Sequence, residues 1–174
     1  GFTVVGGSTF RLTGGTVNAK VASSVFTAGH TTGGTGNFIQ DGGTFDAGGA
    51  EILNAYGAAG TTTINGGLFI CGPFRVAQST GTLNLNGGTL RANNLSHGNT
   101  TSTVNFNGGT LQAKITTTTF VPTTLTNTVV RAGGAIIDSN GFNVTIAKAL
   151  TEDSGSTGGG LTKSGSGTLT LSGA

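Results

Sequence analysis

The sequence contains no methionine and no tryptophan, a single cysteine, two prolines and one tyrosine. Only 8% of its 174 residues are charged. The one cysteine, Cys71, excludes an internal disulfide. Glu, Lys, Gln and Arg are too sparse to build the polar faces of amphipathic helices, so helical structure is not expected beyond short turns.

Clustered charge and long apolar segments are also lacking. Eight basic and six acidic residues give a net charge of +2, and the basic residues are scattered, which argues against a nucleic-acid partner and against an anionic membrane surface. No apolar run approaches the roughly 20 residues of a membrane-spanning helix, so membrane insertion of this segment is not expected. The chain begins at Gly1 without a signal-peptide pattern, and we expect it to be processed or excised from a longer protein.

Glycine, with 34 residues, and alternating apolar residues are abundant. Residues 82–92 read TLNLNGGTLRA, and residues 103–113, 21 positions later, read TVNFNGGTLQA. Apolar and polar residues alternate on both sides of the Asn-Gly-Gly, which is the period of a half-buried strand. Because glycine permits positive φ at a sharp corner, the pattern predicts a strand, a corner and a second strand.

Gly-Gly pairs recur along the chain. The residue before each pair stands at positions 13, 41, 65, 86, 107 and 132, which gives intervals of 28, 24, 21, 21 and 25 residues. A variable period in the twenties is typical of a solenoid, in which each coil buries its inner face only by stacking on its neighbours. We therefore predict an all-β chain with one domain over residues 1–174, a single-stranded parallel β-helix (β-solenoid) with coils of about 21–28 residues.

Counting from each Gly-Gly pair predicts which side chains share a column of the core. One column is large and apolar in every coil: Val17, Phe45, Phe69, Leu90, Leu111 and Ile136. On the other side of the corner, Gln40 and Arg131 interrupt an apolar column. We expect a bulge at each to bring the preceding residue, Ile39 or Val130, to the core instead. Three corner residues are predicted to stack as an amide ladder, namely Asn65, Asn86 and Asn107.

A resemblance to a known family supports the predicted fold. Residues 158–174, GGGLTKSGSGTLTLSGA, closely resemble the autotransporter-associated β-strand repeat, and the NGGTL coils are similar in style to the rest of such passengers. The resemblance implies a right-handed parallel β-helix in a large protein that Gram-negative bacteria secrete or display on their surface. It therefore implies an extracellular or cell-surface location, with flanking parts of a longer passenger as neighbours of this segment.

The acidic residues give no catalytic pattern. Polysaccharide lyases and hydrolases on β-helices need carboxylates grouped on one outer face, often with an Arg or Lys base. Asp41 and Asp46 share one coil but stand on opposite sides of its corner, and Arg91 is expected alone on its face. The remaining acidic candidates lie several coils away: Asp138, Glu152 and Asp153. We expect these residues to be solvated or to cap corners, and we predict no catalytic site.

No cofactor or metal site is predicted either. His30 and His97 lie in glycine-containing loops without a second ligand at zinc-binding spacing. Cys71 occupies a column of alanines and is expected to act as a small buried hydrophobe. The Gly-Gly pairs precede strands, so they are not phosphate loops. A threonine ladder suited to ice binding is interrupted at Leu68 and Ala135.

These patterns predict a non-catalytic structural β-solenoid, and the resemblance implies that it is extracellular, either a surface passenger or adhesin module or a filament-forming subunit. The alternative is a carbohydrate-binding or polysaccharide-cleaving β-helix, and surface glycans are partners to test. Both ends carry alternating apolar residues without a polar cap, so head-to-tail self-association into filaments is one expectation. The residues expected at the two open edges are Phe2, Val4, Leu169 and Leu171.

Overall fold

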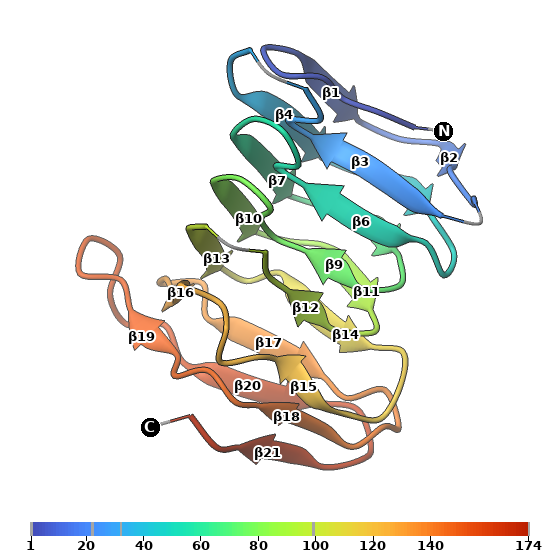
Figure 1. The fold of residues 1–174 in the computed structure, drawn as a ribbon. Coiled ribbons are helices and arrows are strands. Elements are labelled where there is room, and N and C mark those ends of the chain that lie inside the picture. The colour runs from blue at the N-terminus through green and yellow to red at the C-terminus, as the bar shows by residue number, and fades with distance from the viewer. Residues whose placement is uncertain (1, 22, 32, 99, 174) are drawn as a thin grey trace.

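The computed structural model describes residues 1–174 except for 1, 22, 32, 99 and 174. The described residues form twenty-one β-strands and no helix, and hence no helix that could cross a membrane. All the paired strands run parallel, stacked one coil on the next from the N-terminus at one end to the C-terminus at the other (Figure 1). The chain is a β-solenoid, as the repeat predicts.

Parallel strands form three walls of the solenoid. The first wall has the order β1 (Thr9–Leu12), β4 (Gly36–Gln40), β7 (Gly60–Ile64), β10 (Gly81–Leu85), β13 (Ser102–Phe106), β16 (Asn127–Val130) and β19 (Thr151–Glu152). The second has the order β2 (Thr16–Asn18), β5 (Thr44–Asp46), β8 (Leu68–Ile70), β11 (Thr89–Ala92), β14 (Thr110–Ala113), β17 (Ala135–Asp138) and β20 (Leu161–Ser164). The third is divided into two sheets, β3 (Ser24–Ala28), β6 (Glu51–Asn54), β9 (Phe74–Arg75) and β12 (Leu95–Ser96), then β15 (Thr117–Val121), β18 (Val144–Ile146) and β21 (Leu169–Leu171).

The two nearly identical segments stack residue on residue. Leu85 pairs with Phe106, and Leu90 pairs with Leu111 in the second wall. All four side chains are fully buried. Between the two walls the chain turns sharply, and Gly88 at the corner has a φ of 60°, a left-handed conformation that favours glycine. The repeat recurs because each coil buries its apolar face against an equivalent face above and below.

The predicted core column is present in the middle coils and displaced in one later coil. Val17 is half-buried in the first coil, and the next four members, Phe45, Phe69, Leu90 and Leu111, are fully buried. Ile136 is wrong for this column, because Leu111 pairs with Ile137, which is fully buried, while Ile136 faces outward. The corner segment between the partners of Phe106 and Thr110 holds five residues (131–135) where the preceding coil has three (107–109). The longer corner changes the distance in sequence between the Gly-Gly pair and the strands. Counting residues from the pair therefore assigns the wrong side chain to the column in this coil.

The longer corner also explains Arg131. Val130 pairs directly with Phe106 without a bulge, and Arg131 occupies the corner position equivalent to Asn107. The expected bulge at Gln40 is wrong too, because Gln40 pairs regularly with Leu12 and Ile64 and is fully buried. Its Nε2 donates to the carbonyl oxygens of Gly43 and Leu68, each at 3.1 Å. The amide is tolerated in the core because these corner carbonyls accept its hydrogens.

A cluster of three buried polar side chains lies among the apolar columns. Asn54, Thr62 and Thr27 are each fully buried. The Asn54 amide nitrogen lies 2.8 Å from the Val76 carbonyl oxygen, and the Thr62 hydroxyl lies 3.1 Å from Asn54 Oδ1 and 3.2 Å from Thr27 Oγ1. The cluster joins the first and third walls across neighbouring coils, so it fixes their relative register.

The two ends of the solenoid differ. Phe2 packs its ring edge-on against Phe10 and Phe45, with centroids 4.9 and 5.0 Å apart, and Val4 is 5% exposed. Phe2 and Val4 lie at the N-terminal edge of the third wall, where Thr3 bridges Phe26 of β3, and their side chains are turned inward, Phe2 against the core and Val4 into a buried position. At the C-terminal end Leu169 is half-buried, whereas Leu171 is 58% exposed.

Candidate functional site

Charged side chains on the outer surface link successive coils. The shortest approaches between opposite charges are 2.5 Å for Arg11 and Asp41, 2.9 Å for Lys20 and Asp46, 2.8 Å for Arg75 and Glu51, and 2.8 Å for Arg131 and Asp153. These pairs include three of the five acidic residues considered as catalytic candidates. The carboxylates therefore neutralise cations of a neighbouring coil, one pair at a time along the rod.

The other two acidic candidates are also engaged. Asp138 accepts hydrogen bonds from the Gln112 side chain at 2.6 Å and from the backbone N–H of Asn140 at 2.8 Å. Glu152 accepts the N–H of Gly158 at 2.8 Å. Arg91, expected alone, in fact donates to Gln112, so Arg91, Gln112 and Asp138 form a ladder across β11, β14 and β17. Among the described residues, no three His, Cys, Asp or Glu side chains gather as metal ligands.

Hydrogen bonds and cations hold two corner carboxylates ionised. Asp41 accepts a hydrogen bond from Asn65 at 2.7 Å, and this bond, followed by the Arg11 contact, lowers the pKa of Asp41 below its usual value. The backbone N–H of Gly155, at 2.8 Å, is the main cause of the lowered pKa of Asp153. Both residues act as corner caps.

Asp46 shows opposing effects. Burial alone would raise its pKa, but hydrogen bonds from Lys20 and from the N–H of Gly48, the latter at 2.8 Å, outweigh burial and lower it. The ionised carboxylate thus anchors the turn that follows β5. A general acid needs a pKa raised towards the working pH, and Asp46 is shifted the other way.

We expect stability to fall in acid because of these carboxylates. A group whose pKa is lower in the folded than in the unfolded state contributes its full stabilisation above the unfolded pKa, about 4 for Asp, and loses it as pH falls through the folded pKa. The urea midpoint should therefore change little between about pH 7 and 5 and decline below about pH 4. Asp41→Asn should flatten that decline, and a variant curve parallel to the wild-type curve would contradict the assignment.

Asparagine ladders run along the outside of the rod. At the corner, Asn86 donates to Asn65 at 3.0 Å, and Asn65 continues the ladder to Asp41. Asn107 instead accepts the N–H of Gly133 at 3.0 Å in the coil with the longer corner. A second ladder, not predicted from the sequence, lies on the first wall, where Asn105 donates to Asn84 at 2.8 Å and Asn84 to Thr63 at 3.1 Å. The 21-residue spacing of these three residues is the signal that indicates it.

The cysteine is buried beside a lysine strap. Cys71 is fully buried, and burial raises the pKa of its thiol, which keeps it protonated and unreactive at neutral pH. The Lys114 ammonium donates at 2.7 Å to the carbonyl oxygens of both Gly48 and Cys71. The Lys114 side chain, which follows β14, thus contacts the backbone of two earlier coils. Cys71 lies two coils before Lys114, and Gly48 lies three coils before it.

Removal of the Lys114 ammonium should destabilise the rod. Lys114→Met keeps most of the stem but leaves two corner carbonyls without their charged donor, and we expect a loss of about 1–2 kcal/mol in unfolding free energy. Lys20→Met, which removes a more exposed ammonium from a surface ion pair, should cost under about 1 kcal/mol. Urea unfolding of both variants tests the difference, and equal losses would show that the strap has no special role.

The two histidines lie on different parts of the third wall. His30 follows β3 and packs against Phe26 and Tyr56, with ring centroids 4.0 and 5.9 Å away. His97 follows β12 and is half-buried. The structure does not bring the two together with an acidic residue or with Cys71 into a metal centre.

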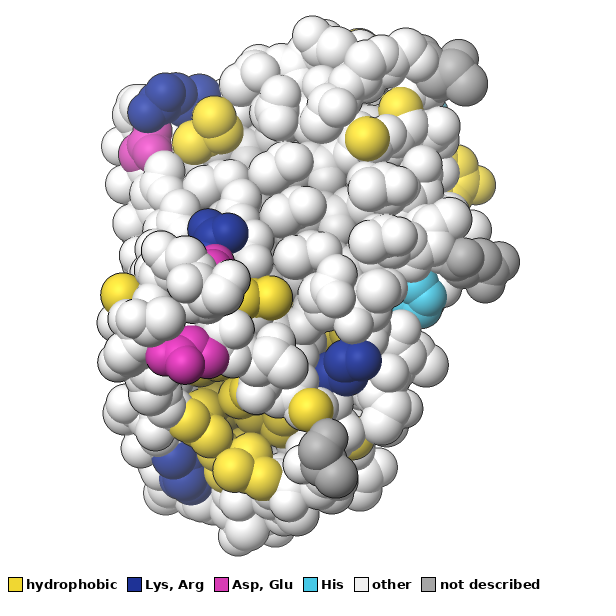
Figure 2. Space-filling model, turned by 90° about the vertical axis from the view of Figure 1, so that its left-hand side faces the viewer, with side chains coloured by type: hydrophobic (Ala, Val, Ile, Leu, Met, Phe, Trp, Pro, Cys, Tyr) yellow, Lys and Arg dark blue, Asp and Glu magenta, His cyan; other side chains and the backbone are white. Residues whose placement is uncertain are grey.

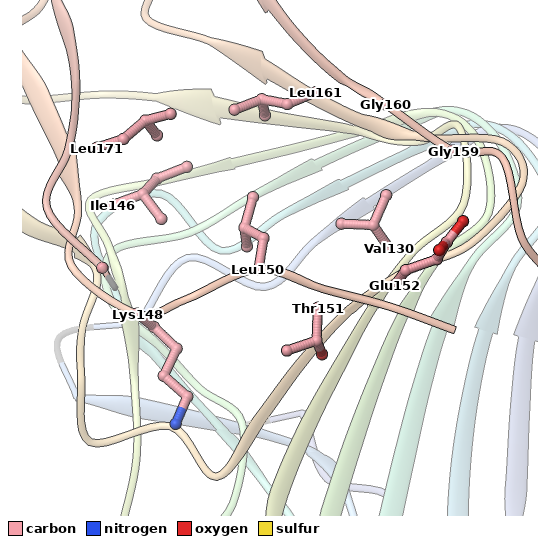
Figure 3. Close-up of a pocket in the computed structure, with 11 residues that line it drawn as sticks. Val130, Ile146, Lys148, Leu150, Thr151, Glu152, Gly159, Gly160, Leu161 and Leu171 are labelled. Carbon is pink, nitrogen blue, oxygen red and sulfur yellow. The ribbon is translucent and has the colours of Figure 1, made fainter. Parts of the chain in front are cut away.

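A hollow opens at the C-terminal end of the core. It has a volume of about 490 Å³, and Figure 3 shows the side chains of Val130, Ile146, Leu150, Leu161 and Leu171 directed into it. Figure 2 shows hydrophobic side chains gathered in this hollow on a surface that is otherwise mainly polar. It lies beside β19, β20 and β21, the last strand of each wall, where the core of a further coil would stack.

No protein-family model, curated protein or solved structure matches the chain.

Proposed function

We propose that the chain is a non-catalytic structural β-solenoid that forms a rigid segment of an extracellular passenger or adhesin. The observation that carries this proposal is the engagement of the acidic side chains in links between coils, since a catalytic cleft would need some of them free and grouped. The resemblance of residues 158–174 to the autotransporter-associated repeat supports the location, and this segment supplies β20 and β21 of the last coil.

Location and chemistry can be tested separately. Antibodies raised against the purified chain should label intact cells of the organism that produces it, and labelling only after lysis would overturn the extracellular location. The chain should release no reducing or unsaturated sugars from a polysaccharide panel. Release that Asp41→Ala or Asp46→Ala abolishes would instead favour a polysaccharide-cleaving β-helix.

The C-terminal hollow favours a second candidate function, that of a filament-forming subunit. Leu161 and Leu171 are 38% and 58% exposed at an edge of strands whose neighbours would complete the core. A second copy could supply those strands through its first coil, because both ends share the same three-walled outline. Such a contact joins unlike ends, so it would propagate along the axis.

Assembly distinguishes the two candidates. A filament-forming subunit should give fibres in negative-stain electron microscopy and elute early in sizing chromatography at high concentration. Replacing Leu161 and Leu171 together by Lys should abolish the fibres while leaving the β-rich circular dichroism intact. A wild-type chain that remains monomeric would eliminate the filament and leave the passenger segment.

A further inference from the structure

An aromatic cluster lies on the outside of the third wall near the N-terminal end. It consists of Phe26, His30 and Tyr56. The Phe26 ring is nearly perpendicular to both others, with centroids 4.0 Å from His30 and 5.2 Å from Tyr56. The His30 and Tyr56 rings are within 13° of parallel, 5.9 Å apart. The His30 and Tyr56 rings are therefore nearly parallel, and the Phe26 ring meets both of them edge-on.

Backbone contacts hold the cluster in place. Phe26 lies on β3 next to an irregularity in the pairing with β6, a feature that redirects side chains. The N–H of His30 donates to the Val4 carbonyl at 3.2 Å. Tyr56 follows Ala55, which has a φ of 56°, an uncommon conformation for a residue with a side chain. Buried Ala55 is itself bonded to the neighbouring coil, so the surrounding fold imposes the direction in which Tyr56 leaves.

The cluster is unusual among the aromatic residues of this chain. The six phenylalanines of the central core are fully buried, and three others pack against it from the ends. Tyr56, the one tyrosine of the sequence, is 45% exposed. A rod that needed only to stack coils would place these rings inside, because exposed aromatic surface gives no folding energy. Phe26 and His30 beside it are half-buried, and a cluster of aromatic residues that reaches the surface is typical of a binding site.

Hydrogen-bonding groups lie two strands from Phe26 on the same outer face, and the N–H of Gln78 donates to the carbonyl oxygen of Ala55, the residue before Tyr56, at 3.1 Å. Phe26 pairs with Leu53 of β6, and Leu53 pairs with Arg75 of β9, so the three side chains follow one column across the wall. The Arg75 guanidinium lies 2.8 Å from Glu51 and donates to Gln78 at 2.7 Å. Glu51 compensates the charge of Arg75, so this group does not present a free cation that would attract an anionic ligand.

We propose that the aromatic cluster binds an uncharged, β-linked pyranose glycan. Equatorial hydroxyls in such sugars leave flat faces of axial C–H groups, which pack on the electron-rich face of an aromatic ring. The hydroxyls at the rim of the same sugar would reach the polar groups around Arg75. This inference goes beyond the structural role, because a solenoid that lacks glycan affinity would still form a rod.

The sequence provides a reporter specific to the site. With one tyrosine and no tryptophan, emission excited at wavelengths longer than the phenylalanine absorption band comes from Tyr56. Titration with hexaoses of β-1,4-linked glucose, N-acetylglucosamine and xylose should change that emission with a dissociation constant of about 0.1–10 mM for at least one sugar. An oligogalacturonate of equal length should bind more weakly. No response to any neutral hexaose at about 10 mM, or tighter binding of the acidic sugar, would overturn the proposal.

Matched variants separate stacking from misfolding. Tyr56→Ala, measured by calorimetry, should weaken binding by about tenfold or more, whereas Tyr56→Phe should keep most of it because the ring remains. Ile115→Ala removes an apolar side chain that is 43% exposed in another coil and should bind as the wild type does. All three variants should have about the same melting temperature as the wild type. Wild-type affinity in Tyr56→Ala, or equal weakening in Ile115→Ala, would contradict the assignment.

Discussion

Leu85→Asp or Leu111→Asp should leave the chain unfolded at 25 °C. Both leucines are fully buried and pair with apolar residues of the adjoining coils. Truncation of a buried leucine costs about 2–5 kcal/mol, and an uncompensated buried charge adds about 3–5 kcal/mol. The sum is comparable with the entire stability of a domain, about 5–15 kcal/mol. Circular dichroism should show loss of the β signal, and thermal scans should show no cooperative transition.

Asn84→Asp is the matched control for Leu85. Asn84 precedes Leu85 on β10 but faces outward, where it bonds to Thr63 and Asn105. Asn84 is half-buried, and a new carboxylate there can still accept the amide hydrogen of Asn105 and the hydroxyl hydrogen of Thr63, so we expect a loss of about 1 kcal/mol or less. Gln112→Asp is a poorer control for Leu111, because it would place a second carboxylate beside Asp138. A lower melting temperature for Asn84→Asp than for Leu85→Asp would show that the register is wrong by one residue.

The sequence predicts the register well where the corners are alike. Asn65, Asn86 and Asn107 each precede a Gly-Gly pair, and the strands on both sides keep a fixed offset from that pair. In the coil at 131–135 the corner gains two residues, and the offset changes on both sides. Nothing in the local pattern of that corner fixes which residue faces inward. Pairing with the preceding coil decides it, and this pairing is a tertiary contact.

Polar residues in the core were the harder part to predict. Hydrophobicity alone predicts that Gln40 faces outward. The prediction fails because the carbonyl oxygens of Gly43 and Leu68, which the sequence pattern does not reveal, accept hydrogen bonds from the Gln40 amide. The aromatic cluster escaped the sequence analysis for a similar reason. His30 and Tyr56 lie 26 positions apart in two glycine-rich loops, and only the stacking of two coils brings them onto Phe26.

Asn54→Asp should strongly destabilise the chain, although the two side chains are nearly isosteric. The amide nitrogen of Asn54 lies 2.8 Å from the Val76 oxygen, 3.2 Å from that of Thr82 and 3.4 Å from that of Gly60. Aspartate would point an oxygen at these acceptors, so donors would be lost and like charges would face one another in a site with no exposed surface.

We expect Asn54→Asp to lower the unfolding free energy by about 3–5 kcal/mol, measured by urea unfolding at pH 7. The control is Asn86→Asp, the same chemical change in the exposed corner ladder, where water can solvate the new carboxylate and the loss should stay near or below about 1 kcal/mol. The contrast isolates burial, because both substitutions exchange one amide for one carboxylate. If the two variants lost similar stability, the buried polar cluster would not be what holds the first and third walls in register, and the apolar columns alone would have to set it.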